Sequence, residues 1–83
     1  MKKEDCELGM FVAVIQNRSS VSRNRLKIKR IGKIVGIYNG FVDLLLFDSN
    51  VSDFDDLDNL MIGRPLYREC FRFSEILKIE KDL

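Results

Sequence analysis

The feature that most constrains this fold is the pair Asn39-Gly40, set between two apolar runs in the stretch RIGKIVGIYNGFVDLLLFD. Asn-Gly between such runs is the strongest short-range hairpin signal, because a type I′ turn needs positive φ at both central positions. We therefore expect a tight antiparallel hairpin over residues 30–48, with a two-residue loop.

Two glycines, Gly32 and Gly36, lie within the first strand of this hairpin. Strict alternation from the turn would place Lys33 beside Ile37 on the face that packs the core. A bulge at Val35-Gly36 instead makes that face entirely apolar. The apolar face then holds Ile34, Ile37, Val42, Leu44 and Leu46. We expect Gly36 to supply the unusual backbone angles of the bulge, and Gly32 to permit a bend or a close backbone approach.

Apolar patterning predicts the other strands. Residues 9–17 form a short apolar run, and residues 26–29 alternate before they enter the hairpin. Residues 63–65 (Gly-Arg-Pro) indicate a turn, and residues 66–73 alternate again. A single helical turn at residues 74–76 and a short last strand follow. The residues expected to be nearly fully buried are Val12, Val14, Ile34, Ile37, Val42, Leu44 and Leu46.

An acidic segment separates the hairpin from residue 63. Ser52 and Asp55 resemble a capping box, and apolar residues follow at helical spacing. One or two turns of helix, or an ordered acidic loop, fit this pattern. The start DSNVSD suggests a calcium loop, but Asp53 and Asn59 stand where the EF-hand needs glycine and glutamate. With no histidine in the chain, zinc also lacks a ligand set, and we expect no metal site.

Composition limits the function further. A chain of 83 residues with a net charge of +1 forms one domain and has no overall field that attracts nucleic acid or membrane. There is no histidine base and no phosphate-binding loop, so we expect a protein that is not an enzyme and has no cofactor. We expect Cys70 to be a packed thiol, and the acids around Cys6 to raise its pKa. No segment predicts a signal peptide or membrane span, which indicates a cytoplasmic protein with reduced thiols.

The motifs GKIVGI, LLFD and FRFSEILKI together resemble the small Src-homology-3-like barrels, with the closest likeness to KOW-type modules and short barrel proteins encoded by phages. The likeness spans roughly residues 8–79. It implies a single domain over residues 1–83: an all-β, five-stranded antiparallel barrel with a short helical or irregular acidic insertion after the third strand. Members of this class bind RNA, peptides, polymerases or larger protein complexes. Unlike KOW modules, this chain has a longer first loop and the acidic insertion.

Three groups of side chains are candidates for a binding site. The basic group contains Arg18, Arg23, Arg25, Lys27, Lys29 and Arg30. The acidic group contains Asp53, Asp55, Asp56 and Asp58. The aromatic group, Tyr38 and Phe41, lies on the second face of the hairpin with Asp43, Leu45 and Phe47.

Each group has alternative interpretations. The basic residues could be a solvated edge, a nucleic-acid surface or a protein-docking surface. The acidic residues could favour a helix N-terminus, solvate a loop, face a basic partner or fold back on the basic loop. The second face of the hairpin could be covered by other segments or exposed as an aromatic patch.

We expect a binding module that docks onto and modulates a larger protein or nucleoprotein assembly, as a phage-type accessory or inhibitor protein would. The neutral total charge and the separated basic and acidic segments favour this function. The alternative is a KOW-like module that binds RNA or DNA through residues 18–33.

Overall fold

The computed structural model describes residues 1–15 and 27–79, which contain a single antiparallel five-stranded sheet. The strands are β1 (Phe11–Ile15), β2 (Ile28–Ile37), β3 (Val42–Ser49), β4 (Ile62–Phe71) and β5 (Ile76–Lys78). Their order in the sheet is β4-β3-β2-β1-β5. The described residues also form three short 3-10 helices and no α-helix; these are η1 (Lys3–Asp5), η2 (Phe54–Asn59) and η3 (Phe73–Glu75). The predicted class, a mostly β protein with five antiparallel strands, is confirmed.

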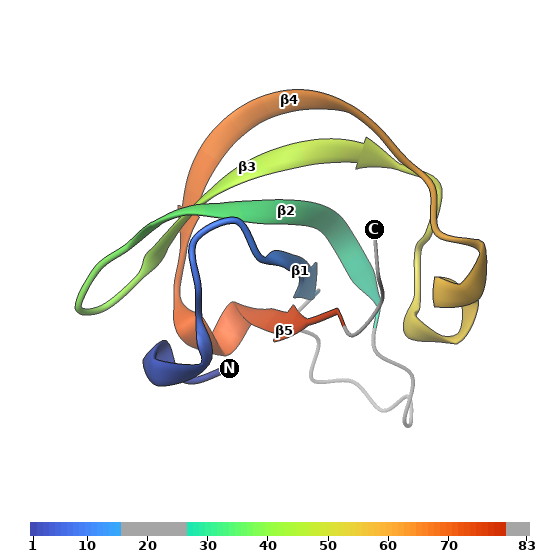
Figure 1. Ribbon diagram of the computed structural model, residues 1–83. Coiled ribbons are helices and arrows are strands. Elements are labelled where there is room, and N and C mark those ends of the chain that lie inside the picture. Colours follow the sequence, from blue (N-terminus) through green and yellow to red (C-terminus); the bar gives the residue numbers. More distant parts are fainter. Residues whose placement is uncertain (16–26, 80–83) are drawn as a thin grey trace.

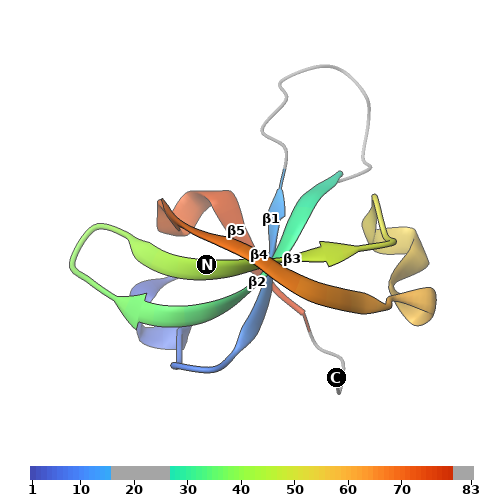
Figure 2. The ribbon, with the colours of Figure 1, turned by 90° about the horizontal axis from the view of Figure 1, so that it is seen from above.

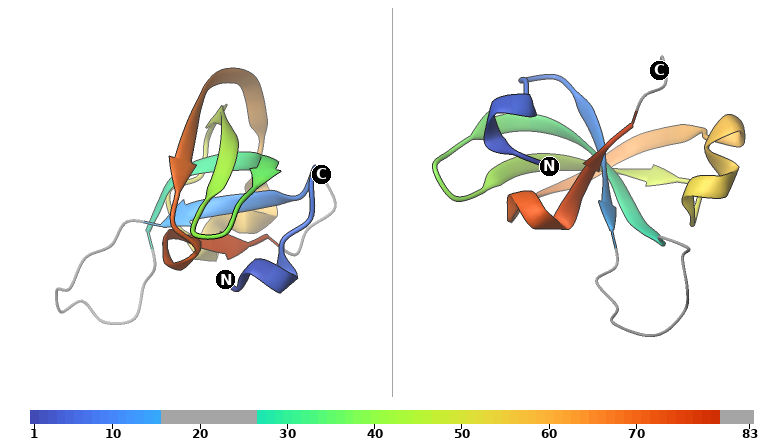
Figure 3. Two further views of the ribbon diagram at one scale, coloured as in Figure 1. Left: turned by 90° about the vertical axis from the view of Figure 1, so that its left-hand side faces the viewer. Right: turned by 90° about the horizontal axis from the view of Figure 1, so that it is seen from below.

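The sheet is strongly curved. In Figure 1, β4 arcs over the top of the fold and β5 lies at the bottom, and the left view of Figure 3 shows the same separation from the side. Seen from above in Figure 2, β3 and β4 cross β1 at a steep angle. Because β1 pairs with both β2 and β5, the sheet bends around the apolar side chains on its inner face.

Buried residues form two clusters on opposite faces of β1. The inner cluster contains Cys6, Val12, Val14, Ile34, Val42, Leu44, Leu46, Phe71 and Ile76. The outer cluster contains Ala13, Ile28, Ile31, Val51, Leu60 and Ile79, and η2 packs Phe54 and Leu57 against it. The predicted core residues are at most 2% exposed, with the exception of Ile37, which is half-buried at the end of β2.

The predicted bulge in β2 is present. Ile34 and Gly36 lie opposite consecutive residues of β3, so Val35 is an extra residue on this strand. Ile37 lies opposite Val42, as predicted. Because side chains alternate along a strand, the extra residue keeps both isoleucines on the inner face. Val35 itself is 39% exposed.

Neighbouring side chains lie close to both glycines of β2. The expectation that Gly36 supplies unusual backbone angles is wrong. Its φ is not positive, so its backbone does not adopt the left-handed conformation that favours glycine. A Cβ atom at Gly36 would lie 2.9 Å from the ring of Tyr38, which covers this position. A Cβ atom at Gly32 would lie 3.1 Å from methyl groups of Leu44 and Leu46. The close approach predicted for Gly32 is therefore confirmed.

The loop at Asn39-Gly40 is not a type I′ turn, because Gly40 lacks the positive φ that this turn requires. The predicted pair still forms, since the Tyr38 N–H donates a hydrogen bond to the Phe41 carbonyl at 2.9 Å. Side chains brace the loop. The Tyr38 and Phe41 rings stack with centroids 4.9 Å apart, and Lys3 Nζ donates to Asn39 Oδ1 at 2.9 Å.

The turn predicted at residues 63–65 is also wrong, because these residues belong to β4. The register between β3 and β4 shifts on both sides of Phe47. Pro65 has no N–H, and an irregular edge strand is the position in a sheet where proline is accommodated. The acidic segment forms η2, in which two short 3-10 turns meet at a kink at Asp56. The expected single turn and last strand appear as η3 and β5.

Residues 9 and 10 dock against β2 beside the bulge. The Gly9 N–H donates to the Ile34 carbonyl at 2.8 Å, and the Ile34 N–H donates to the Met10 carbonyl at 2.9 Å. Gly9 reaches this position with a φ of +88°, in a turn closed by the Met10 N–H and the Glu7 carbonyl. This left-handed conformation favours glycine.

We predict that Gly9→Ala lowers the free energy of unfolding by about 1–2 kcal/mol, because alanine is strained at positive φ. Gly40→Ala should be nearly neutral, since Gly40 has ordinary φ and open space around its Cα. Urea denaturation of the two variants measures both effects. An equal loss at Gly40 would mean that the loop adopts the type I′ conformation after all.

We also predict that Leu44→Ala lowers the free energy of unfolding by about 2–5 kcal/mol, because it leaves a cavity in the inner cluster. Leu8→Ala is the matched control, since Leu8 is 67% exposed. The control should change stability by less than about 0.5 kcal/mol. Comparable losses in the two variants would contradict the register of β3.

Candidate functional site

The predicted site residues that the structure describes lie at opposite ends of β2. Lys27, Lys29 and Arg30 lie at its start, and Tyr38 and Phe41 follow its end. The ten residues of β2 separate these two groups in a fold whose longest dimension is 31 Å. Figure 1 shows η2 and the hairpin tip at opposite sides of the fold. Arg18, Arg23, Arg25 and the side chain of Asp55 lie outside the described residues, and the predicted groups do not form one site.

At the start of β2, the acidic segment lies against the basic one. Lys27 and Asp53 form an isolated antiparallel bridge, and the Ile28 N–H donates to the Ser52 carbonyl at 2.7 Å. Asp53 is buried, while Lys27 and Lys29 are exposed and Arg30 is half-buried. Asp56 and Asp58 are exposed on η2. Negative and positive side chains therefore share this end of the molecule.

At the other end, aromatic side chains are exposed. Tyr38 is 47% exposed and Phe41 is 41% exposed, although the two rings stack on each other. The Tyr38 ring also packs over the backbone of Gly36, which restricts its position. The second face of the hairpin is thus divided. Phe47 is half-buried against Phe11 with ring centroids 5.7 Å apart, whereas the hairpin tip is uncovered.

An ion pair adjoins these aromatic residues. Arg68 Nη2 on β4 donates to Asp43 Oδ2 on β3 at 2.5 Å. The Asp43 side chain is 12% exposed and the Arg68 side chain is 65% exposed. The hydrogen bond and charge of Asp43 raise the pKa of Arg68, with further contributions from Tyr38 and Cys70. The guanidinium therefore stays charged beside the aromatic rings, and most of it faces solvent.

We call this surface the Tyr38–Arg68 face; it consists of Tyr38, Phe41, Asp43, Arg68 and Cys70. Sequence reasoning identified its two aromatic residues but missed the ion pair. The opposite charges at positions 43 and 68 were visible in the sequence, but only the register between β3 and β4 brings them together. Cys70 is exposed, so the expectation of a packed thiol at this position is wrong.

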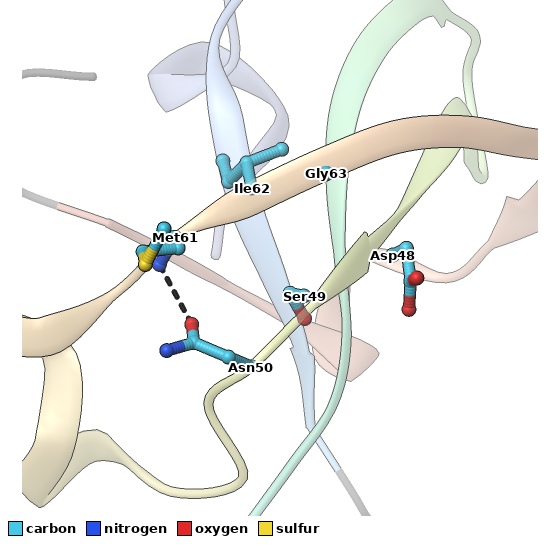
Figure 4. Close-up of a pocket in the computed structure, with 6 residues that line it drawn as sticks. All are labelled: Asp48, Ser49, Asn50, Met61, Ile62 and Gly63. Carbon is cyan, nitrogen blue, oxygen red and sulfur yellow. Dashed lines mark hydrogen bonds between the residues drawn. The ribbon is translucent and has the colours of Figure 1, made fainter.

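A shallow pocket at the β3–β4 connection is lined by Asp48, Ser49, Asn50, Met61, Ile62 and Gly63 (Figure 4). The Asn50 side chain bridges this connection. Its Oδ1 accepts a hydrogen bond from the Met61 N–H at 2.7 Å, and its Nδ2 donates to the Asn59 carbonyl at 2.9 Å. Asn50 therefore satisfies backbone groups of the loop, and we assign it a structural role.

Among the described residues, no cluster of three or more His, Cys, Asp or Glu side chains is placed to hold a metal ion. No helix in that part of the chain is long and apolar enough to cross a membrane. Burial raises the pKa of the Cys6 thiol, and Asp5 and Glu4 raise it further, while the N-terminal ammonium opposes them. The predicted direction for Cys6 is correct, although burial is the largest cause.

Comparison with known proteins gives no match to this chain among family models, curated proteins or solved structures.

We predict that iodoacetamide alkylates Cys70 faster than Cys6 near pH 8, because Cys70 is exposed whereas Cys6 is buried with a raised pKa. A raised pKa leaves less thiolate at any given pH, and the thiolate is the reactive form. Peptide mass spectrometry over time measures the two rates, with Cys70→Ser confirming the assignment. Equal rates in the native protein would contradict the packing of residues 1–10.

Proposed function

We propose that this protein is a non-enzymatic docking module that binds a larger protein assembly through the Tyr38–Arg68 face. The module belongs, in this proposal, to the Src-homology-3-like barrels. The five antiparallel strands, the strong curvature of the sheet and the one-turn helix η3 before the last strand support that placement. An accessory or inhibitory subunit of the kind encoded by phages is consistent with a domain this small.

The observation that carries the proposal is an exposed, pre-ordered aromatic pair beside an arginine. Aromatic residues and arginine are enriched at protein interfaces and supply most of the binding energy there. The stack with Phe41 and the contact with Gly36 already restrict Tyr38, so binding costs less side-chain entropy. Asp43 orients Arg68 while leaving donors of the guanidinium free for a partner.

Nucleic-acid binding has less support from the described residues. Lys27 and Lys29 would have to contact phosphates at the same end of the molecule as Asp56 and Asp58. The carboxylates of these two residues repel phosphates. The bridge between Lys27 and Asp53 holds the acidic segment at that end of β2. Nucleic-acid binding is therefore the alternative function, and nuclease treatment in the following test distinguishes it from protein docking.

We predict that the double variant Tyr38→Ser/Phe41→Ser loses a protein that the wild type captures from its native host lysate. Both side chains are exposed, so the variant should fold, which circular dichroism checks. Capture is compared by quantitative mass spectrometry before and after nuclease treatment. Met61→Ser is the matched control, because Met61 is 70% exposed and lies between η2 and β4, on the opposite side of the fold from the hairpin tip.

The proposal requires a captured protein that survives nuclease, remains with Met61→Ser and is lost with the double variant. Loss of all capture after nuclease would indicate the nucleic-acid function instead. In that case, changing Asp53, Asp56 and Asp58 to asparagine should strengthen RNA or DNA binding, and its affinity should fall steeply with salt. Equal capture by the double variant would exclude the Tyr38–Arg68 face.

A further inference from the structure

Strand β4 is exposed to an unusual degree for a strand that covers a core. Every residue from Gly63 to Cys70 is exposed, on both faces of the strand. Opposite them on β3, Leu44 and Leu46 are almost completely buried. The exposed residues include Leu66 at 38% and Tyr67 at 51%. Leu66 and Tyr67 of β4 are therefore partly in solvent, whereas Leu44 and Leu46 of the neighbouring strand are packed.

The outer edge of β4 is unpaired within the described part of the sheet, because β4 is the terminal strand and bonds to β3 alone. Edge strands are normally protected by proline, bulges or charges. Here Pro65 and both register shifts lie in the first half of β4. Residues 67–71 pair with residues 42–46 without interruption. The second half of the strand thus presents a regular ladder edge without proline or bulge, on which Arg68 and Glu69 are the charged residues.

A second copy of this chain fits this edge poorly. When two copies of β4 pair antiparallel about a two-fold axis, each residue lies opposite a residue whose side chain points to the same face of the sheet. The residue at the axis lies opposite the identical residue of the other copy. Centring the pair on Arg68 or Glu69 would set like charges against each other, which destabilises a sheet. Centring it on Cys70 would set Arg68 opposite Arg72, again with like charges. Centring it on Tyr67 would include Pro65, which cannot donate to a ladder.

The chemistry of the edge favours a partner strand with a carboxylate. Arg68 lies within the regular segment, and its side chain is 65% exposed although Asp43 already binds it. A guanidinium has five N–H donors and can bind a second carboxylate. On the other face of the strand, Tyr67 offers an apolar contact for a β-branched or aromatic residue.

We propose that the free edge of β4 binds an extended segment of a partner protein as an additional strand, with an acidic residue beside Arg68 and an apolar residue beside Tyr67. Strand addition of this kind obtains affinity from main-chain hydrogen bonds and specificity from alternate side chains. The inference rests on the proposed docking function and specifies its mode. The Tyr38–Arg68 face continues onto this edge through Arg68, so both surfaces can contact one partner.

The test uses short capped peptides in which glutamate alternates with valine and threonine, and matched peptides with lysine in place of glutamate. Binding is followed by backbone amide shifts of the labelled protein. We expect the glutamate peptide to shift the amides of residues 67–71 and to bind at least about tenfold more tightly than the lysine peptide. Arg68→Gln should remove this preference, and Tyr67→Lys should weaken binding of both peptides.

Main-chain pairing is tested with two N-methylated glutamate peptides whose methyl groups occupy complementary sets of alternate residues. One pattern blocks the peptide edge that faces β4 and should abolish binding, whereas the other should leave it intact. Equal effects of the two patterns, shifts confined to the hairpin, or no shifts at about millimolar peptide would each overturn strand addition. Sedimentation that shows a dimer with protected β4 amides would also overturn it, because the occupant would then be a second copy.

The two proposals fail in different ways. Tyr38→Ser/Phe41→Ser should leave peptide binding at β4 unchanged, so a loss of lysate capture in that variant tests the Tyr38–Arg68 face alone. Tyr67→Lys tests the edge alone. Peptide binding without lysate capture would support strand addition at β4 and contradict docking through the Tyr38–Arg68 face. Lysate capture that depends on Tyr38 and Phe41, without peptide binding, would support the docking face and contradict strand addition.

Discussion

The single extra residue at Val35 is the constraint on which the rest of this structure depends. Without it, Ile34 and Ile37 could not both face the inner cluster, because a one-residue slip reverses every side chain beyond it. The irregularity adjoins Gly36, which lies beneath the Tyr38 ring, and Ile34, whose main chain bonds to residues 9 and 10. Core packing, the aromatic hairpin tip and the docking of the N-terminal segment therefore meet at this point of β2.

Much of the fold could be predicted because its strongest signals are local. The hairpin register followed from the alternation of apolar residues around Asn39-Gly40, and the bulge followed from Lys33, which otherwise would have entered the core. Predictions failed where distant segments decide. The loop conformation at Gly40 forms alongside a contact from Lys3, 36 residues away. Pro65 lies within a strand because that strand is an edge, which only the tertiary structure shows.

The candidate site was predictable to a smaller extent for the same reason. Tyr38 and Phe41 belong to the hairpin, so their shared face followed from its register. Arg68 binds Asp43 across 25 residues and two irregularities in the β3–β4 pairing, and no local pattern sets that register. The sequence also left open whether the acidic segment folds back on the basic one, because it is an isolated bridge between Lys27 and Asp53 that brings them together at the start of β2.

The position of β1 between β2 and β5 has a consequence for the order of folding during synthesis. Val12 and Val14 lie opposite Lys78 and Ile76, so the second neighbour of β1 is synthesised after the other four strands. Pairing between segments so distant in the chain is slow, because loop-closure entropy is lost before the contacts form. A nascent chain that has reached η2 can form the β2–β3 hairpin but leaves one edge of β1 open. The ribosome must therefore release β5 before the inner cluster is sealed.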